Sequence, residues 1–260
     1  MPYAHGRQDK ARSDIYELAR ILYHRTMKVL LYGNNANSLS PLLARFGLAE
    51  VKENPEVVIS FGGDGTFILS EVAFPGVPKV MVRDSKICKK CVNLPTEEIL
   101  KRLSASQFVE NSIIKLQAIY GEKKYVVVND VIISHVVPSA AVRYKIQING
   151  VPYVDGREIV GDGIVVATPF GSGAYYRSIT DGVFSTGLGI AFNNSTEQVD
   201  HIIIKETDEI CFELSRGHAL LALPGHDIEQ IAEGGSVLIK RAEECGKILT
   251  FGEEFRYWAH

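Results

Sequence analysis

The first part of the chain alternates short apolar runs with segments of helical periodicity. The apolar runs, each expected to form a buried strand, are Lys28–Tyr32, Val57–Phe61 and Pro78–Val82. The segments with helical periodicity or helix-start signals are Ala11–Arg25, Ser40–Phe46, Thr66–Ala73 and Thr96–Leu103. Strands that alternate with helices predict a parallel sheet covered by helices, so we expect an α/β domain with a Rossmann-like sheet.

After about residue 110 the pattern changes to strands alone. Val142–Ile148 alternates apolar and polar residues, and Asn149-Gly150 then provides the two positive-φ residues of a tight hairpin. The other expected strands are Ile113–Tyr120, Tyr125–Ile133, Ile164–Ala167, His201–Ile204, Glu209–Leu214, Ala219–Leu223 and Ser236–Lys240. We therefore expect an α/β domain over residues 1–108, a β-rich domain over residues 109–245 and a tail over residues 246–260.

The charge balance argues against a nucleic-acid partner. The 260 residues include 28 basic and 31 acidic side chains, for a net charge of -3, so a small-molecule partner is favoured. The chain has no apolar run of the roughly 20 residues needed to cross a bilayer, and its start lacks the apolar core of a signal peptide. These features predict a soluble, cytoplasmic protein with no membrane partner.

Cys88 and Cys91 have the spacing of half a zinc site or of a redox pair. The second half of a zinc site is missing, because Cys211 and Cys245 are isolated and no histidine pair has ligand spacing. A lone motif of this kind is a weak signal, so metal or redox chemistry there is not the favoured interpretation.

A glycine-rich turn, Gly62-Gly63-Asp64-Gly65-Thr66, follows the second apolar run. Where a parallel strand runs through such a turn into a helix, free backbone N–H groups at the positive end of the helix dipole form a phosphate site. Asp64 would repel phosphates unless a divalent cation lies between them or the carboxylate accepts a proton during reaction. Both roles indicate phosphoryl transfer. From the residues alone, Asp64 could equally cap the helix that begins near Thr66.

A second acidic and glycine-rich segment repeats this arrangement. Gly161-Asp162-Gly163 precedes an apolar strand, and the stretch TPFGSGAY at Thr168–Tyr175 follows it. The first turn alone resembles the signature shared by NAD kinases and by diacylglycerol and sphingosine kinases. With Asn129-Asp130 and the second segment, the chain resembles the NAD kinase family specifically, which pairs G-G-D-G-T with N-E/D, G-D-G and T-P-x-G-S-x-A-Y. The resemblance is strong over residues 57–178.

This resemblance implies transfer of a phosphoryl group from ATP or polyphosphate to the 2'-hydroxyl of the adenosine ribose of NAD, giving NADP. It implies that Asp64 is the catalytic acid that orients or deprotonates this hydroxyl, with Mg²⁺ or a similar divalent ion. The residues that it assigns to nucleotide binding are Gly62, Gly63, Gly65 and Thr66 at the phosphates, Asn129 and Asp130 at the adenosine, Asp162 near the nicotinamide, and Ala174, Tyr175 and Ser178 along the dinucleotide pocket. It also implies a homo-oligomer, dimer or tetramer, and a C-terminal tail that packs on the first domain.

The chain departs from the family pattern at several positions. The family's Gly-x-Asn and Leu-Gly-Phe elements have no clear counterpart after the third strand, where Arg83 and Lys86 could instead meet donor phosphates. Phe170 stands where a small polar residue is common, and Gly173 replaces a threonine. The residues alone also leave Tyr175 open as an ordinary core residue. Two other functions stay open: a lipid kinase of the diacylglycerol or sphingosine class, and a catalytically silent nucleotide-binding protein.

Overall fold

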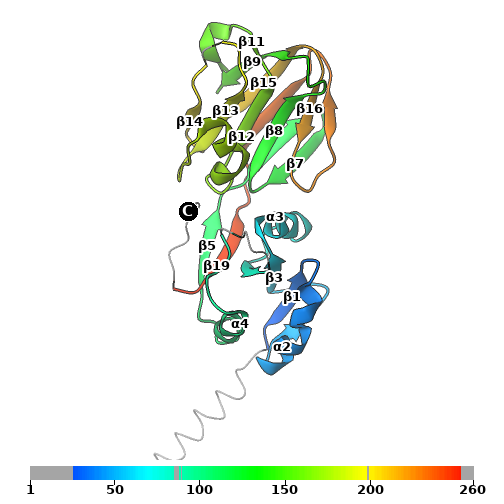
Figure 1. The fold of residues 1–260 in the computed structure, drawn as a ribbon, viewed down its shortest axis with the longest axis vertical. Helices are drawn as coiled ribbons and strands as arrows, with labels where there is room; N and C mark the ends of the chain where they lie inside the picture. The colour runs from blue at the N-terminus through cyan, green and yellow to red at the C-terminus, as the bar shows by residue number, and fades with distance from the viewer. Residues whose placement is uncertain (1–25, 85–87, 89, 198, 253–260) are drawn as a thin grey trace, which may run out of the picture.

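The computed structural model describes residues 26–84, 88, 90–197 and 199–252, whose strands form three sheets (Figure 1). The strand order of the first sheet is β2 (Ala49–Glu50), β1 (Lys28–Tyr32), β3 (Val57–Gly62), β4 (Lys79–Arg83), β19 (Gly246–Thr250) and β5 (Val109–Ile113). All of these strands are parallel except β5, which runs antiparallel to β19 at the edge. β19 therefore brings the end of the described chain back into the sheet that contains its beginning.

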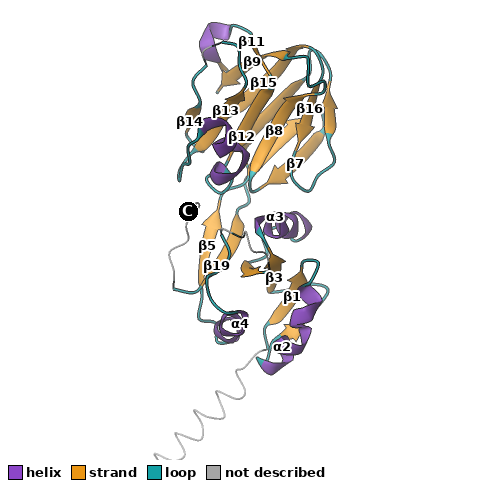
Figure 2. Cartoon of the chain, in the orientation of Figure 1, coloured by secondary structure: helices purple, strands orange, loops and turns teal. Residues whose placement is uncertain are grey.

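Helices cover both faces of the first sheet. They are η1 (Ala36–Leu39), α2 (Ser40–Arg45), α3 (Asp64–Ala73) and α4 (Thr96–Ser104), and they lie around the sheet in Figure 2. Because successive side chains of a strand point to opposite faces, Val80 of β4 packs with Leu100 of α4, whereas the next residue, Met81, packs with Phe67 of α3. The first face forms the core of this half, and the second face turns toward the rest of the molecule.

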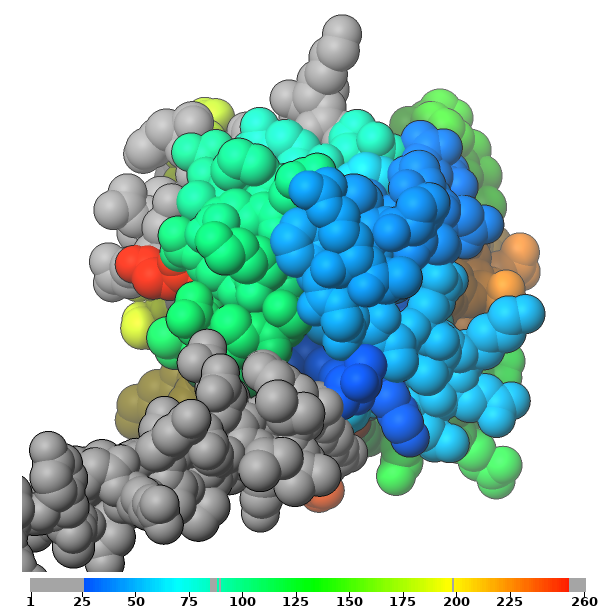
Figure 3. Space-filling model, turned by 90° about the horizontal axis from the view of Figure 1, so that it is seen from below, coloured from blue at the N-terminus to red at the C-terminus, as the bar shows by residue number. Residues whose placement is uncertain are grey.

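The helices of this half are short. Seen from below, α2 and α4 lie side by side (Figure 3), and an ion pair of 3.2 Å joins Arg45 of α2 to Glu97 of α4 at the surface. Among the residues that the structure describes, no helix is long and apolar enough to span a membrane.

The second and third sheets pack face to face as a β-sandwich. The second sheet has the order β10 (Val151–Pro152), β9 (Val142–Ile148), β15 (Ile210–Arg216), β18 (Ser236–Arg241), β6 (Leu116–Tyr120) and β7 (Lys123–Val127), with β11 (Ile159–Gly161) also paired to β9. The third has the order β14 (Ile202–Ile204), β13 (Leu188–Asn193), β12 (Gly163–Ala167), β8 (Asp130–His135), β16 (Ala219–Ala222) and β17 (Glu229–Ile231). The short helical segments here are η2 (Tyr153–Gly156), η3 (Ser172–Tyr176) and α5 (Arg177–Thr180).

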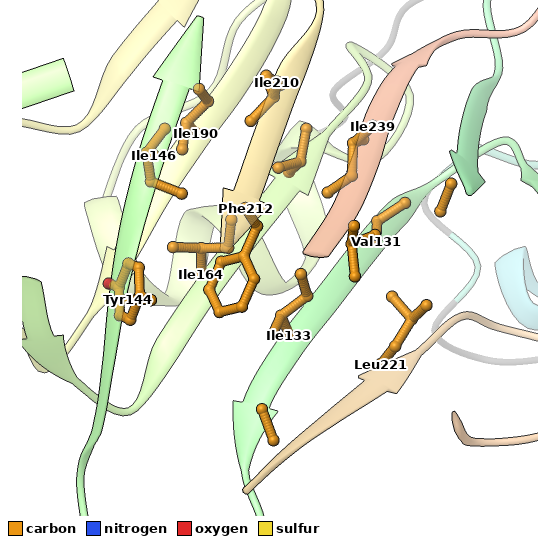
Figure 4. Close-up of a cluster of buried hydrophobic side chains, with 14 of the residues drawn as sticks. Val131, Ile133, Tyr144, Ile146, Ile164, Ile190, Ile210, Phe212, Leu221 and Ile239 are labelled. Carbon is orange, nitrogen blue, oxygen red and sulfur yellow. The ribbon is translucent and has the colours of Figure 1, made fainter. Parts of the chain in front are cut away.

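The core of the sandwich lies between these two sheets. Tyr144 and Phe212 of the second sheet stack at 5.0 Å between ring centroids, and Ile133 and Ile164 of the third sheet belong to the same buried cluster (Figure 4). The strand pairs within both sheets are antiparallel, as the alternating pattern of this half predicts.

The chain passes between the two halves twice, from β5 to β6 and from β18 to β19. Lys115 lies in the first crossing, and its Nζ is 2.6 Å from Oε1 of Glu71 in α3 and 2.8 Å from Oε1 of Glu244 in the second crossing. Lys79 of β4 also contacts Glu71, at 2.5 Å, and burial lowers the pKa of Lys79 despite this attraction. These four residues, here called the crossing cluster, tie α3 to both crossings.

Several expected boundaries differ from the observed ones. The segment expected as one strand at Tyr125–Ile133 divides into β7 and β8, which belong to different sheets. β5 pairs with β19 in the first sheet, so the first crossing follows Ile113 rather than residue 108. β13 was not expected, and α3 begins at Asp64 rather than Thr66. The helix expected at Ala11–Arg25 and the last part of the tail, residues 253–260, lie outside the described residues.

Candidate functional site

The glycine turn lies where β3 ends and α3 begins. Gly62 closes β3, Asp64 opens α3, and the backbone N–H of Gly63 donates to Oγ1 of Thr66 at 3.4 Å. A Cβ on Gly62 would lie 2.2 Å from the same Oγ1, whereas a Cβ on Gly65 would meet no atom within 4 Å. The turn is therefore tightly packed on its inner side and open at Gly65. Because the first N–H groups of α3 have no partner within the helix, this open side suits an anion.

A pocket of about 490 Å³ opens beside the turn, at the carboxyl ends of β1, β3 and β4. Its lining residues are Tyr32, Gly33, Asn34, Asn35, Phe61, Gly62, Gly63, Thr66, Leu69 and Asp84. Gly33 has a φ of 136°, and a Cβ there would lie 2.1 Å from the carbonyl oxygen of Phe61, so only glycine lets the turn after β1 approach β3. Ligands of parallel α/β sheets bind at this edge of the sheet.

Two contributors to this pocket were not predicted from the sequence. Asn35 follows β1 and Asp84 follows β4, and Nδ2 of Asn35 donates to Oδ2 of Asp84 at 2.8 Å. The available signal was the Gly33-Asn34-Asn35 turn, which follows an apolar strand as the glycine turn does. Since the carboxyl ends of neighbouring parallel strands meet at one edge, such turns belong to one site.

Asp64 does not cap α3. Gly63 occupies the cap position, and the side chain that bonds to its N–H is that of Thr66, so the capping alternative is wrong. Oδ1 of the half-buried Asp64 instead lies 3.4 Å from Sγ of Cys88, which forms a disulfide with Cys91. Sγ of Cys91 lies 3.5 Å from the carbonyl oxygen of Gly62. The cysteine pair, which the sequence indicated only weakly, therefore lies against the glycine turn.

Asn129 lies just before β8 and Asp130 is the first residue of that strand, where the two meet the second glycine-rich turn. The N–H of Thr168 donates to the carbonyl oxygen of Asn129 at 2.9 Å, and its hydroxyl donates to that of Val128 at 2.5 Å. A Cβ on Gly171 would lie 2.2 Å from the carbonyl oxygen of Asn129, so a side chain there is excluded. The two predicted motifs therefore form one packed unit.

Asp130 is a buried carboxylic acid, only 2% exposed. Burial raises its pKa to about 6, although the side chain of Asn129, the charge of Lys90 and the backbone N–H of Tyr175 all act to lower it. Asp130 is therefore mostly ionised at neutral pH. A carboxylate can accept two hydrogen bonds from a sugar diol, so Asp130 is suited to bind a ribose.

Contacts through the loop after β4 join this unit to the glycine turn. The rings of Phe67 in α3 and Phe170 in the second turn lie 5.1 Å apart between centroids. Nζ of Lys90 donates to the carbonyl oxygen of Phe170 at 2.6 Å, lies 3.9 Å from the centroid of its ring, and acts on Asp130 by its charge. Phe170 is fully buried, so its departure from the family pattern changes the packing between the halves.

Tyr175 lies at the surface of η3, on the outer side of the third sheet. It is 37% exposed, whereas the neighbouring Tyr176 is 5% exposed, so the interpretation of Tyr175 as a core residue is wrong. Nδ2 of Asn193 donates to the hydroxyl of Tyr175 at 3.3 Å. Ala174 and Ser178 are also exposed, and Oγ of Ser178 donates to the carbonyl oxygen of Tyr175 at 2.7 Å.

Asp162 lies at the opposite end of β12 from Asp130. The strands β12 and β8 pair along their length. Gly163, which follows Asp162, pairs with Ser134, and Ala167 at the other end of β12 pairs with Asp130. The N–H of Asp162 donates to the carbonyl oxygen of Asn193 at 2.9 Å, and the side chain of Asn193 reaches Tyr175. Through Asn193 and Tyr175, polar groups extend from Asp130 toward Asp162, a layout that suits an elongated ligand.

The other departures from the family pattern among the described residues, at Arg83 and Gly173, place no buried side chain in the site. Arg83 is exposed at the end of β4, opposite Gly62 in the register of the sheet, and Lys86 lies outside the described residues. A Cβ on Gly173 would meet no atom within 4 Å, so the packing of the protein does not require a glycine there.

Within the described ranges, no three His, Cys, Asp or Glu side chains come together as a metal site. Mg²⁺ in sites of phosphoryl transfer keeps several waters and is held by one or two carboxylates and by the substrate phosphates. A glycine turn with free N–H donors is therefore suited to phosphates that bring their own cation.

Known proteins similar in sequence are NAD kinases. The enzyme of Lactobacillus delbrueckii subsp. bulgaricus is 28% identical over 165 residues, which cover 58% of this chain and 59% of the relative's own length. The enzyme of Sulfurimonas denitrificans is 24% identical over 263 aligned positions, which cover 95% of this chain and 89% of that protein. No protein-family model matches the chain.

Solved structures with the same fold are also kinases of this kind. An NAD kinase from Archaeoglobus fulgidus in complex with ATP matches with a TM-score of 0.71 and 15% identity, over 88% of this chain and 95% of that chain. Yeast NADH kinase complexed with NADH matches with a TM-score of 0.70 and 14% identity, over 95% of this chain and 81% of that chain. An α/β domain joined to a β-rich domain is therefore the fold that this chain shares with them.

Proposed function

We propose that this chain, a divergent member of the NAD kinase family, transfers a phosphoryl group from ATP or polyphosphate to the adenosine ribose 2'-hydroxyl of NAD, giving NADP. One observation carries this proposal. The glycine turn with Asp64 and the unit of Asn129 and Asp130 face one another across the two halves, joined by Phe67, Phe170 and Lys90. An anion site and a ribose site that are joined in this way are what this reaction requires.

Asp64 is the proposed general base. Its carboxylate accepts the proton of the 2'-hydroxyl as the oxygen attacks the terminal phosphorus, and ADP, or the shortened polyphosphate, leaves with the electron pair of the broken bond. The open side of the glycine turn at Gly65, with the free N–H groups of α3, would receive the phosphates. The nucleotide donor would enter as its magnesium complex, and the ion would neutralise charge on the phosphates.

The acceptor would lie along the third sheet. Asn129 and Asp130 would hold the ribose diol and the adenine end, and the exposed Ala174, Tyr175 and Ser178 would line the dinucleotide. Asp162 lies next to the far end of β12 from Asp130, where it would lie near the nicotinamide.

The lipid-kinase alternative is less favoured, because the similar proteins and structures named above act on NAD or NADH by name. A silent nucleotide-binding protein would have the same fold, so only an activity measurement separates it from an enzyme.

The deciding experiment incubates the purified protein with NAD, ATP and Mg²⁺ and detects NADP with an NADP-specific dehydrogenase. Polyphosphate in place of ATP, NADH in place of NAD and a diacylglycerol acceptor form parallel arms. NADP formation that needs the protein supports the proposal. A folded protein that forms no NADP with either donor contradicts it, and phosphorylation of the lipid alone would favour the lipid-kinase alternative.

Two further properties belong to this proposal. We propose a homo-oligomer, dimer or tetramer, in which the pocket lined by Ala174, Tyr175 and Ser178 lies partly across a subunit contact; light scattering at several concentrations tests it. We also propose that the protein acts in the cytoplasm, which fractionation of the source cells tests.

A further inference from the structure

Cys88 and Cys91 form a disulfide against the glycine turn, and the proposed reaction gives this pair no role. Their Cα atoms lie 5.7 Å apart, within the range that a disulfide requires. One sulfur lies 3.4 Å from Oδ1 of Asp64 and the other 3.5 Å from the carbonyl oxygen of Gly62. Both sulfurs therefore contact oxygen atoms of the segment that carries the proposed base.

The two redox states offer different groups to these oxygens. In the disulfide neither sulfur carries a proton, so neither can donate a hydrogen bond. After reduction each sulfur carries a proton, and thiols at these positions are within donor reach of Asp64 and of the Gly62 carbonyl. A hydrogen bond from a thiol to a carboxylate favours its charged form and makes it a poorer proton acceptor. Reduction should therefore weaken Asp64 as a base.

The surroundings of the pair strengthen this coupling. Cys88 and Cys91 are 5% and 8% exposed and belong to one buried cluster with Phe67 of α3 and Phe170 of the second turn. Two separate thiols need more room than a bonded pair, because an S–S bond is only about 2 Å long. Because the cluster is closely packed, the two thiols would displace the rings of Phe67 and Phe170, which join the halves of the site.

We propose that Cys88 and Cys91 are a thiol–disulfide exchange site for a dithiol reductant, and that their redox state sets the rate of phosphoryl transfer through Asp64. The exchange site stands on the cysteine geometry alone, whereas its effect on rate rests on the proposed function. A disulfide across two intervening residues is typical of redox-active pairs, and disulfides of reducing compartments are mostly redox-sensing or catalytic.

The exchange balances as follows. A thiolate of the reductant attacks Sγ of Cys91, the more exposed cysteine; the Cys88–Cys91 bond breaks, and a mixed disulfide forms on Cys91. The second thiolate of the reductant then displaces Cys91 and closes the reductant's own disulfide. Two electrons pass from the reductant to the protein, and the two protons from the reductant's thiols end on Cys88 and Cys91.

The first test measures the exchange itself. The protein, prepared without reductant, is treated with dithiothreitol or left untreated, and free thiols are alkylated under native conditions and located by mass spectrometry. We expect Cys88 and Cys91 to be labelled only after treatment, and to re-form the disulfide when an oxidised dithiol is added. Cys211 and Cys245 are free and serve as internal references. Free thiols at both positions without reductant, or a disulfide that dithiothreitol leaves intact in the folded protein, overturn the exchange site.

The second test measures the coupling. We expect the reduced protein to have a kcat about threefold to tenfold below that of the oxidised protein, the effect of one ordinary hydrogen bond, because a thiol is a weak donor, with the KM for NAD within about twofold. Cys88→Ala has no donor at this position and should match the oxidised protein, whereas Cys88→Ser keeps a hydroxyl donor and should match the reduced one. Neither variant should respond to dithiothreitol, and Cys211→Ser should respond as the parent does.

The outcomes separate the two proposals. Equal kcat in both redox states, or equal kcat for Cys88→Ala and Cys88→Ser, overturns the coupling while NADP formation still supports the enzyme. If neither state forms NADP, the proposed function and the coupling both fail, and the labelling still decides the exchange site.

Discussion

Asp130 shows how one residue balances stability against binding. Burial raises its pKa from the ordinary 3.8 to about 6, so the folded protein holds this proton more tightly than the unfolded chain does. Stability contributed at this site is therefore greatest at low pH, falls as the pH rises from 3.8 to about 6, and is fully lost above that. Three partners limit this cost without removing it. We interpret the cost as the consequence of a carboxylate kept in place for a ligand.

The dependence of NAD affinity on pH follows from this pKa. If the ionised Asp130 binds the ribose, the dissociation constant for NAD should be constant above about pH 7 and rise as the pH falls through about 6, approaching tenfold for each further pH unit. Titration calorimetry between about pH 5 and about pH 8 measures it. Asp130→Asn should bind NAD weakly at every pH and should be at least as stable as the parent at pH 7. If the affinity of the parent for NAD does not change with pH, Asp130 does not bind NAD as proposed.

Asp64→Asn tests the proposed base. The amide keeps the size of the side chain but cannot take the proton of the hydroxyl, so we expect kcat to fall by at least about a hundredfold, while ATP and NAD bind within a few-fold of the parent. Steady-state kinetics with NADP detection and equilibrium binding give the two numbers. The matched control is Asp84→Asn, because Asp84 lines the adjacent pocket and its side chain pairs with Asn35, while its contact with the turn is made by its backbone N–H, which the substitution keeps. Similar losses in both variants would contradict a specific role for Asp64.

The sequence predicted residues by their motifs better than by their surroundings. Asp64, Asn129 and Asp130 were singled out by their motifs and by the family resemblance of those motifs, and contacts of Phe67, Phe170 and Lys90 join the segments that carry them. The sequence left Tyr175 open as a core residue, because the residues of an irregular turn have no periodicity that assigns them to a face. Nor could it place Cys88 beside Asp64, since that contact depends on how the loop after β4 folds back.

At the scale of elements, the second glycine turn contains one glycine that packing requires and one that it does not. A Cβ on Gly171 would lie 2.2 Å from the carbonyl oxygen of Asn129, whereas a Cβ on Gly173 would meet nothing within 4 Å. We expect Gly171→Ala to lower the free energy of unfolding by about 2 kcal/mol or more and to weaken NAD binding, because the turn must move away from Asn129. Gly173→Ala, the matched control, should stay within about 0.5 kcal/mol. Urea denaturation of both variants measures the difference, and equal losses would show that the clash is relieved without moving the turn.

The strands were predictable where the whole apolar run belongs to one sheet and its ends are set by local turn residues. The hairpin at Asn149-Gly150 is present, with φ of 52° and 76°, because its turn chemistry is local. The segment Tyr125–Ile133 was expected as one strand because its apolar run continues, yet the chain changes sheets at Val128-Asn129. That break depends on Thr168, which binds both residues from a distant part of the chain. Periodicity cannot report such a contact.

On the scale of the whole molecule, the two halves are held together by buried charge as well as by apolar contact. The return of the tail to the first domain was implied by family resemblance, and β19 does lie between β4 and β5. The crossing cluster was not foreseen, because Glu71, Lys79 and Lys115 look like ordinary surface residues in the sequence. Their burial arises only when both crossings pass beside the end of α3.

The crossing cluster yields the last prediction. Glu71→Gln keeps the size of the side chain but leaves Lys79 and Lys115 as buried cations with no buried carboxylate between them. We expect the free energy of unfolding to fall by about 3–5 kcal/mol, because an unpaired buried charge costs far more than an exposed ion pair contributes. Glu97→Gln is the matched control: its partner Arg45 is 64% exposed, and the loss should stay below about 1 kcal/mol. Urea denaturation followed by circular dichroism measures both variants.

The calorimetric unfolding of Glu71→Gln should also show two transitions, since the substitution weakens the link between halves that otherwise unfold together. Equal losses in the two variants, with one transition in each, would mean that apolar packing around Phe67 and Phe170 holds the halves together without help from the cluster.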